Sequence, residues 1–291
     1  MTTTSDRDQL EAAVEHGYAD SDGVRIHFAA LGSGPLLVLI HGFPDFWYTW
    51  RYQMPALARE HRVVAMDLRG YNLSDQPPGP QNYAMPHLLA DVRAVIEHQG
   101  SATGATVIGH DWGGAIAWQL AMAHPEQVRR LVVLNMPHPA AFFRELATNP
   151  DQHASGEYAR GFLDEQTHLR LRAEDLVGWL PVQGPERDRH LHALRQSSIQ
   201  AMLHYYQRNY PRPPYPQAPP RPPSLEVPVL MIHGMRDPAI LPGGLNDTWN
   251  WVAAPLTILT LPQAGHFVHL DAAEHVTTVL LSWLRATATS T

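Results

Sequence analysis

The sequence predicts an α/β protein in which helices flank a mostly parallel central sheet, with a helical cap inserted into the sheet domain. Short apolar runs alternate with helical patterns up to residue 138 and again from residue 224. Between these parts, strong strand patterns are absent and helical periodicity gives way to prolines. We therefore expect a core domain built from residues 1–138 and 224–291, and a cap at 139–223 that ends in a proline-rich return connector.

The composition limits the classes of protein and of site. A chain of 291 residues is long enough for a large α/β domain with an insertion. Its net charge of -7 argues against nucleic acid or an anionic membrane as the main partner. Because the chain has no cysteine, disulfides, thiolate catalysis and thiolate metal sites are excluded.

The start of the chain and its longest apolar runs bear on its location. Residues 1–8 are polar and lack the apolar core of a signal peptide. No apolar run in the sequence is long enough to span a bilayer. We therefore expect a soluble, cytoplasmic enzyme or binding protein.

The first part of the chain predicts strands and helices in alternation. Residues 24–29 alternate between polar and apolar and are expected to pair with a strand around 17–19. The run 36–40 is apolar throughout, as in a central strand covered on both faces. Further strands are predicted at 62–67, 105–109 and 128–134, and helices at 47–59, 85–98 and 115–123. This alternation indicates parallel strands joined by right-handed crossovers.

The inserted segment predicts mainly helix, with its best helices at 163–179 and 190–206. The prolines at 211–216 and 219–223 exclude helix and central strand, so we expect a stiff extended connector there. Beyond the connector, strands are predicted at 227–233 and 256–261, and a closing helix at 272–284. The simplest arrangement is one core domain interrupted by a helical insertion.

One stretch predicts the position of a nucleophile. Gly109-His110-Asp111-Trp112-Gly113 follows an apolar strand and precedes a helix-forming run. It has the frame of the Gly-x-Ser-x-Gly nucleophile elbow, with Asp111 in the place of the serine. Such a turn strains its central residue and needs small neighbours, which Gly109 and Gly113 provide. We therefore expect Asp111 to be a carboxylate nucleophile that faces a cleft.

Two later residues complete a catalytic triad. Asp237 and His266 each follow a predicted strand. Asp237 precedes a proline and His266 is one of 18 histidines, so each alone also fits a plain structural role. Together, in the order nucleophile, acid, histidine, they match the α/β-hydrolase triad, whose members come from the carboxyl ends of strands. The strand predicted at 128–134 ends in Asn135, which cannot supply the negative charge, so Asp237 is the expected acid.

These motifs resemble those of the epoxide hydrolases of the α/β-hydrolase fold, and the resemblance runs from about residue 18 to residue 284. The similar motifs are His41-Gly42-Phe43-Pro44, Asp67-x-Arg69-Gly70-Tyr71, Gly109-His110-Asp111-Trp112-Gly113-Gly114, Gly234-x-x-Asp237-Pro238 and Gly265-His266-Phe267. The resemblance implies an α/β-hydrolase fold with a cap. It also implies conversion of a small apolar epoxide and water to a vicinal diol through an alkyl ester on Asp111, with neither a metal nor an organic cofactor.

The resemblance further implies two catalytic residues in the cap. In epoxide hydrolases two cap tyrosines hold the epoxide oxygen, and Tyr158 and Tyr206 match their positions. The surroundings of Tyr206 depart from the family pattern, because His204 replaces an asparagine and Gln207 an arginine. Around Tyr158, only a short stretch of sequence matches the family pattern. We expect both hydroxyls to bind the leaving oxygen.

Hydrolysis of the ester passes through a tetrahedral anion, which needs N–H donors. The backbone N–H groups of Phe43 and Trp112 are expected to form this oxyanion hole, because one follows a strand end and the other follows the nucleophile. The walls of the substrate pocket are expected to include Phe43, Trp112, Trp179 and Phe267.

The same core motifs also fit haloalkane and haloacetate dehalogenases, which share the aspartate nucleophile. Phe43 offers no side-chain donor at a position where haloalkane dehalogenases often have one for halide. Haloacetate dehalogenases have arginines one and four places past the nucleophile, where this chain has Trp112 and Ala115. Both departures favour an epoxide hydrolase. A dehalogenase remains the alternative enzyme, a non-catalytic receptor for a small ligand is the alternative of another class, and the sequence leaves open whether a homodimer forms.

Overall fold

The computed structural model describes residues 10–101, 103–215 and 224–288, and within them eight strands form a mostly parallel sheet. The strand order is β1-β2-β4-β3-β5-β6-β7-β8. The strands are β1 (Glu15–Ser21), β2 (Val24–Leu31), β3 (Leu36–Ile40), β4 (Arg62–Met66), β5 (Ala105–His110), β6 (Val128–Leu134), β7 (Val229–Gly234) and β8 (Leu256–Leu261). The predicted fold class is confirmed.

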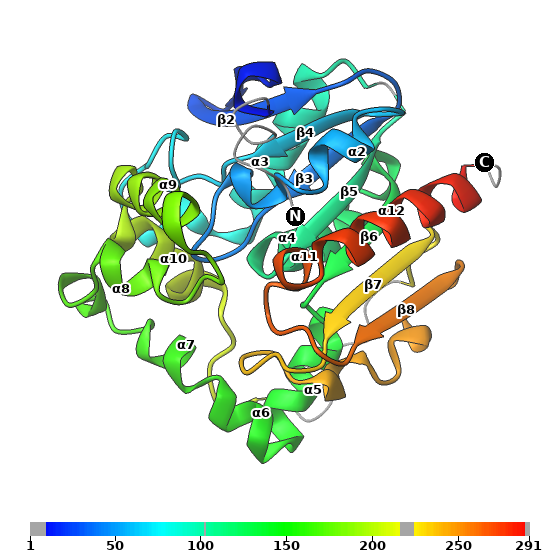
Figure 1. Cartoon of the computed structure of the whole chain (residues 1–291). Helices are drawn as coiled ribbons and strands as arrows, with labels where there is room; N and C mark the ends of the chain where they lie inside the picture. Colours follow the sequence, from blue (N-terminus) through cyan, green and yellow to red (C-terminus); the bar gives the residue numbers. More distant parts are fainter. Residues whose placement is uncertain (1–9, 102, 216–223, 289–291) are drawn as a thin grey trace.

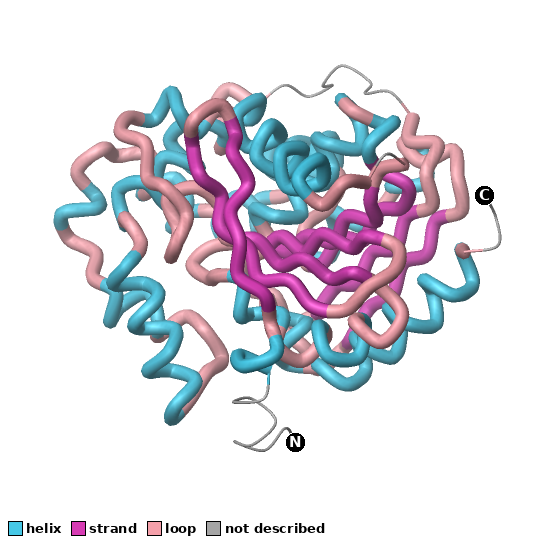
Figure 2. Tube along the Cα trace, turned by 90° about the horizontal axis from the view of Figure 1, so that it is seen from above, coloured by secondary structure: helices cyan, strands magenta, loops and turns pink. Residues whose placement is uncertain are grey.

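The sheet begins antiparallel and continues parallel. Strands β1 and β2 form an antiparallel hairpin that runs along one side of the sheet in Figure 2, and β2 also pairs antiparallel with β4. The pairs from β4 through β3, β5, β6 and β7 to β8 are parallel. Every residue of β3 and β5 is buried, as expected for apolar central strands. The carboxyl ends of the parallel strands therefore meet at one edge of the sheet.

Helices cover both faces of the sheet (Figure 1). The core helices are α2 (Met54–Leu57), α3 (Met85–His98), α4 (Trp112–Ala123), α11 (Val268–Asp271) and α12 (Ala273–Thr287). Successive side chains of a strand point to opposite faces. Val107 of β5 accordingly packs in the cluster that includes α3 and α4, whereas Ile108 packs in the cluster that includes α2 and α12. Among the described helices, none combines the length and apolarity needed to cross a bilayer.

The segment between β6 and β7 contains a series of short helices. They are α5 (Pro139–Thr148), α6 (Pro150–Ser155), α7 (Glu157–Gly161), α8 (Ala173–Val177), α9 (Gly184–Gln196) and α10 (Ile199–Asn209). In Figure 1 these helices lie on the side to which the strand arrows point. We call this segment the cap. Residues 216–223 of the predicted connector lie outside the described part of the chain.

The prediction of one long helix at 163–179 is wrong. The structure has a 3₁₀ turn at Thr167–Leu169 and the short helix α8 in this region. The carboxylate of Asp164 accepts the backbone N–H of Gln166. The carboxylate of Asp175 accepts the backbone N–H of Arg172, which starts α8 anew. Local bonds of this kind compete with a continuous helix, so a periodic sequence is divided here.

The helices predicted at 190–206 and 47–59 are also divided. Between α9 and α10, Ser197 and Ser198 have extended backbones, and the Ser198 hydroxyl accepts the N–H of Ala201 as the N-cap of α10. Serine is among the best N-cap residues, so the helix restarts at this point. The region 47–59 contains a 3₁₀ turn at Trp47–Trp50 and the four residues of α2.

Buried charged groups join the cap to the core. The Arg51 Nε lies 3.0 Å from Oε2 of Glu186 on α9, and these side chains are only 4% and 7% exposed. Nearby, Oδ1 of Asp45 lies 3.4 Å from Nε2 of His190, also on α9. Buried apolar side chains of the cap and of the core belong to one continuous cluster. The cap is therefore packed tightly on the carboxyl edge of the sheet.

Candidate active site

Asp111 occupies the sharp turn between β5 and α4. Its φ of 51° lies in the left-handed region, which is strained for a residue other than glycine. Its neighbour Gly113 must be small, because a Cβ there would lie 2.2 Å from the carbonyl oxygen of Ile40. The turn therefore holds the Asp111 side chain at the carboxyl edge of the sheet, where the residue is 5% exposed.

The Asp111 carboxylate lies between a backbone donor and a histidine. Its Oδ1 accepts the N–H of Phe43 at 2.8 Å, and its Oδ2 lies 3.6 Å from Nε2 of His266. Burial raises the pKa of Asp111, but the hydrogen bond and the charge of His266 outweigh burial and lower the pKa below its ordinary value. Asp111 is therefore an anion at neutral pH.

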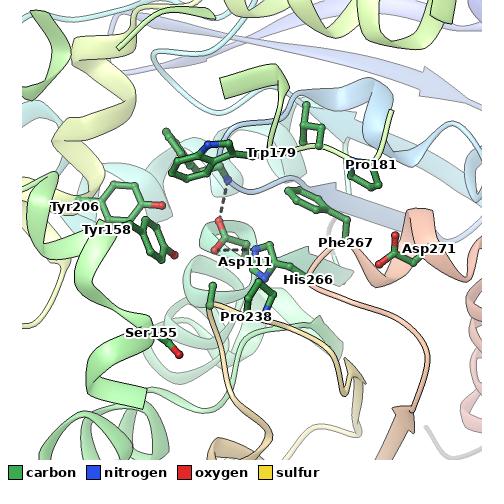
Figure 3. Close-up of a pocket in the computed structure, with 13 residues that line it drawn as sticks. Asp111, Ser155, Tyr158, Trp179, Pro181, Tyr206, Pro238, His266, Phe267 and Asp271 are labelled. Carbon is green, nitrogen blue, oxygen red and sulfur yellow. Dashed lines mark hydrogen bonds and ion pairs between the residues drawn. The ribbon is translucent and has the colours of Figure 1, made fainter. Parts of the chain in front are cut away.

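His266 and Asp237 form an ion pair beside this carboxylate. Nδ1 of His266 lies 2.8 Å from Oδ2 of Asp237. Burial lowers the pKa of His266, but the charge of Asp237 and the hydrogen bonds to Asp111 and Asp237 raise it to about 10. Burial raises the pKa of Asp237, but the charge of His266 and several hydrogen bonds lower it to about 2. With Nδ1 held in this way, Nε2 points toward Asp111 (Figure 3).

Asn135 holds the acid of this pair, a role that the sequence did not suggest. It follows β6 with a φ of 48°, and its Nδ2 donates to Oδ2 of Asp237 at 2.7 Å and to the carbonyl oxygen of Gly265 at 3.2 Å. The other Asp237 oxygen accepts the backbone N–H groups of Ala239 and Ile240. From the sequence, position 135 was noted only as a strand end that cannot supply a negative charge.

A cavity of about 550 Å³ opens beside Asp111 and is bounded by both the core and the cap. The aromatic residues Phe43, Trp179 and Phe267, all expected as pocket walls, line it. Figure 3 shows two tyrosines on one side of Asp111 and the ring of Phe267 on the other. The walls around the Asp111 carboxylate are therefore mainly aromatic and aliphatic.

Tyr158 on α7 and Tyr206 on α10 face this cavity from the cap. Their rings lie edge-on to each other, with centroids 6.5 Å apart. Burial, followed by the charge of Asp111, raises the pKa of Tyr158 well above its ordinary value. Burial, the neighbouring Tyr158 and the charge of Asp111 do the same to the pKa of Tyr206. Both hydroxyls therefore keep their protons and can donate to an oxygen atom in the cavity.

A second, smaller cavity of about 100 Å³ meets the first at Asp111, because Asp111, Tyr158 and Tyr206 line both. Trp112, expected as a pocket wall, lines the smaller cavity, together with Phe142. The rings of Trp112 and Tyr206 pack edge-on, with centroids 5.1 Å apart. A bound molecule at Asp111 thus has space on two sides.

Two buried histidines hold the loops around the site. His41 is hydrogen-bonded through Nδ1 to the carbonyl oxygen of Gly42, and its Nε2 accepts the N–H of Leu68. His110 is hydrogen-bonded through Nε2 to the carbonyl oxygen of His266. Burial, with the charge of His266, lowers the pKa of His110 to about 4, so it is neutral near pH 7. Both histidines therefore position the loops of the site.

Six residues that line the larger cavity were missed from the sequence. They are Ser155, Leu180, Pro181, Pro238, Ala239 and Asp271. None of them belongs to a recognisable chemical pattern except Pro238, which lies within a strand-end motif. Within the described residues, no group of three or more histidines and carboxylates is arranged to hold a metal ion.

Comparisons with known proteins agree with this geometry. The model of the alpha/beta hydrolase fold family matches residues 35–273. The chain is 30% identical to Epoxide hydrolase 3 of Xenopus tropicalis over 287 residues, which cover 93% of this chain and 78% of the relative. It is 34% identical to Epoxide hydrolase 1 of Caenorhabditis elegans over 281 residues, which cover 87% of this chain and 66% of the relative. The crystal structure of an epoxide hydrolase of Bacillus megaterium in complex with an inhibitor is similar, with a TM-score of 0.84, 30% identity and coverage of 92% of this chain and 100% of that chain.

Proposed function

Because this chain belongs to the alpha/beta hydrolase fold family and, within it, to the epoxide hydrolases, we propose that Asp111 opens an epoxide ring as a covalent nucleophile. One observation carries this proposal. The ionised carboxylate of Asp111 and the protonated hydroxyls of Tyr158 and Tyr206 line the same cavity. A small molecule in this cavity can thus contact both a nucleophile for its ring carbon and proton donors for its departing oxygen.

The first half-reaction forms an ester. An oxygen of Asp111 attacks one ring carbon from behind, a C–O bond forms, and the ring C–O bond on that carbon breaks. The epoxide oxygen leaves as an alkoxide. Tyr158 and Tyr206 donate hydrogen bonds to it, and one of them transfers its proton. The product of this step is a hydroxyalkyl ester of Asp111.

The second half-reaction hydrolyses that ester. Water attacks the carbonyl carbon of the Asp111 side chain, and His266 takes the proton of the water through Nε2. The backbone N–H groups of Phe43 and Trp112 stabilise the tetrahedral anion; the existing bond from Phe43 to Oδ1 of Asp111 supports this role. The C–O bond to the diol then breaks, and the proton of the new carboxyl group passes to the departing alkoxide. Asp111 is again a carboxylate and His266 again holds a proton, as at the start, so protons balance over the cycle.

The charge state of His266 fits this order of steps. The charge and the hydrogen bond of Asp111 are among the causes that raise the pKa of His266. When Asp111 becomes an ester it loses its negative charge, so the pKa of His266 falls. His266 therefore passes its proton to the tyrosinate left by the first step and is a neutral base at the stage when a base is needed.

The cavity supports a small, mainly apolar epoxide as substrate. Its volume of about 550 Å³ lies in the range of ordinary small-molecule sites. The rings of Phe43, Trp179 and Phe267 would contact an aryl or alkyl substituent. Water is the second substrate.

The reaction is tested by product and by isotope. Incubation with an aryl epoxide should give diol, and incubation with a haloalkane should give no free halide. In a single turnover in heavy-oxygen water, the label should enter Asp111 and be absent from the diol. Label in the first-turnover diol would contradict the ester, and halide release without diol would favour a dehalogenase.

A further inference from the structure

A cavity of about 290 Å³ lies at the amino edge of the sheet, which is the edge opposite the catalytic site. Its walls include the beginnings of four parallel strands, at Leu36 of β3, Arg62 of β4, Thr106 of β5 and Arg130 of β6. Among the described residues that line it there are three arginines and no carboxylate. The cavity is therefore cationic on a chain whose net charge is -7.

Arg130 is the central feature of this cavity. The residue is 8% exposed, although its guanidinium group always carries a charge. Its Nε donates to the Thr106 hydroxyl at 3.0 Å, and its Nη1 donates to the carbonyl oxygen of Leu284 at 2.8 Å and to the Thr287 hydroxyl at 3.2 Å. These partners are neutral, and within the described residues no bond occupies Nη2. One end of a buried guanidinium thus remains for another acceptor.

The other buried arginines of the described chain show what is normal in this protein. Arg51 pairs with Glu186 and Arg69 pairs with Asp91. The pair with Asp91 outweighs burial and raises the pKa of Arg69, whereas burial and the charge of Arg129 lower the pKa of Arg130. A buried charge without a counter-ion costs free energy. Arg130 therefore lacks the anion that its buried counterparts have.

A second guanidinium adds to the charge of the cavity. Arg129 lines the cavity and donates to the Thr103 hydroxyl, and it has no carboxylate partner among the described residues. Arg62, in contrast, already pairs with Glu15 at 2.8 Å. Two positive charges are thus uncompensated, which matches the charge of a phosphate monoester near neutral pH.

A plain structural role for Arg130 explains only part of this arrangement. Its Nη1 bonds to Leu284 and Thr287 cap the carboxyl end of α12, where a cation is favourable. This role uses neither Nη2 nor Arg129, and it does not explain why both arginines line a cavity.

We propose that this cavity binds the phosphate group of a small phosphate monoester, with Arg130 and Arg129 as its ligands. Arginine suits this task because its planar fork of donors matches the oxygens of phosphate. The volume of about 290 Å³ is many times what one water molecule needs, so the cavity has space for an organic group beside the phosphate. This site is separate from the catalytic cavity and does not depend on the proposed reaction.

The proposal is tested by calorimetric titration of the full chain at constant ionic strength. The probes are inorganic phosphate, glucose phosphate, glucose, acetate, and vesicles with and without phosphatidate. Glucose phosphate should bind saturably and more tightly than phosphate, while glucose and acetate should not bind. Binding only to phosphatidate vesicles would overturn the proposal, because the ligand would then be a lipid surface.

Variants separate the phosphate site from a helix cap. Arg130→Gln and Arg129→Gln should each raise the Kd for glucose phosphate about tenfold or more, with turnover of epoxide unchanged. The control is Arg187→Gln on α9, which removes an equal charge far from this cavity and should leave the Kd within about twofold. If Arg130→Gln fails to fold, the test rests on the variant Arg129→Gln, because Arg129 is exposed. The proposal is wrong if the unaltered chain shows no saturable binding, or if Arg129→Gln and the control bind alike.

Discussion

At the scale of single residues, the two tyrosines of the cap are the proton donors that we propose for the leaving oxygen. We predict that Tyr206→Phe lowers kcat/KM for an epoxide by about 10²–10³-fold, because one of two donors to the alkoxide is lost. Tyr158→Phe should have a similar effect. The measurement is steady-state diol formation, with single-turnover kinetics to show that ester formation is the slowed step.

Tyr205→Phe is the matched control for these variants. Tyr205 is also a buried tyrosine of α10, but its hydroxyl donates to the carbonyl oxygen of Arg69 and it does not line the described cavities. This change should lower stability and leave kcat nearly unaltered. Equal losses of kcat in Tyr205→Phe and Tyr206→Phe would show that the effect comes from packing.

Asn135 is hydrogen-bonded to Asp237, so we expect it to act on the reaction as a positioning residue. We predict that Asn135→Gly, which keeps the left-handed backbone and removes the amide, slows ester hydrolysis more than ester formation. Loss of the bond should raise the pKa of Asp237 and weaken its hold on His266. Rapid-quench kinetics should show the ester accumulating. A variant that slows both steps equally, with an unchanged pH profile, would indicate a structural role alone.

The positions of the candidate site residues were predictable to different degrees. The place of Asp111 in a sharp turn could be predicted because this turn demands small neighbours at fixed spacing, which leaves a pattern in the sequence. Asn135 could not, because its role depends on a strand end lying beside Asp237, and only the folded sheet creates that proximity. Pro181 and Asp271 reach the cavity by packing, which no local pattern records.

At the scale of elements, the order of strands was predictable and the division of the cap helices was not. Apolar runs such as 36–40 predict strands because burial on both faces requires them. The serine pair at 197–198 carried a capping signal, but the apolar periodicity of 190–206 continues through it. In the sequence, a serine that ends one helix cannot be distinguished from a serine that faces solvent within a continuous helix. Tertiary packing decides between the two.

The joint between cap and core gives a prediction at this scale. Arg51 and Glu186 are buried together, so removal of one charge leaves the other without its partner. We predict that Glu186→Gln lowers the free energy of unfolding by on the order of 3 kcal/mol. The measurement is urea unfolding followed by circular dichroism.

A surface pair in the cap provides the control for this joint. Arg195 pairs with Glu174 at 2.7 Å, but both side chains are about half exposed. Glu174→Gln should therefore change the free energy of unfolding by less than about 1 kcal/mol. If Glu174→Gln and Glu186→Gln cost the same, burial at the joint is not what stabilises the cap.

At the scale of the whole molecule, the ion pair of the site shapes how stability depends on pH. The pKa of Asp237 is lowered from 3.8 to about 2, so its contribution is present above pH 3.8 and is lost as pH falls through about 2. The pKa of His266 is raised from 6.5 to about 10, so its contribution is complete below pH 6.5 and is lost as pH rises toward about 10. Both contributions are present between about pH 4 and pH 6.5, where we predict that the pair adds about 2 kcal/mol to the free energy of unfolding.

This pH dependence is measured by urea unfolding from acid to alkaline pH. The variant His266→Gln removes the cation and should flatten the curve on both sides of the plateau. A curve for His266→Gln that parallels that of the unaltered chain would assign the dependence to other buried groups.

The main chain and the side chain of Phe43 make different contacts. Its N–H donates to Asp111, whereas its ring packs edge-on against Trp179 and Tyr206, with centroids 5.9 Å and 5.4 Å apart. Every variant at this position except proline therefore keeps the backbone N–H donor and changes only the wall of the cavity. Selection for one enantiomer of an epoxide can begin at residue 43, with little risk of screening inactive enzymes.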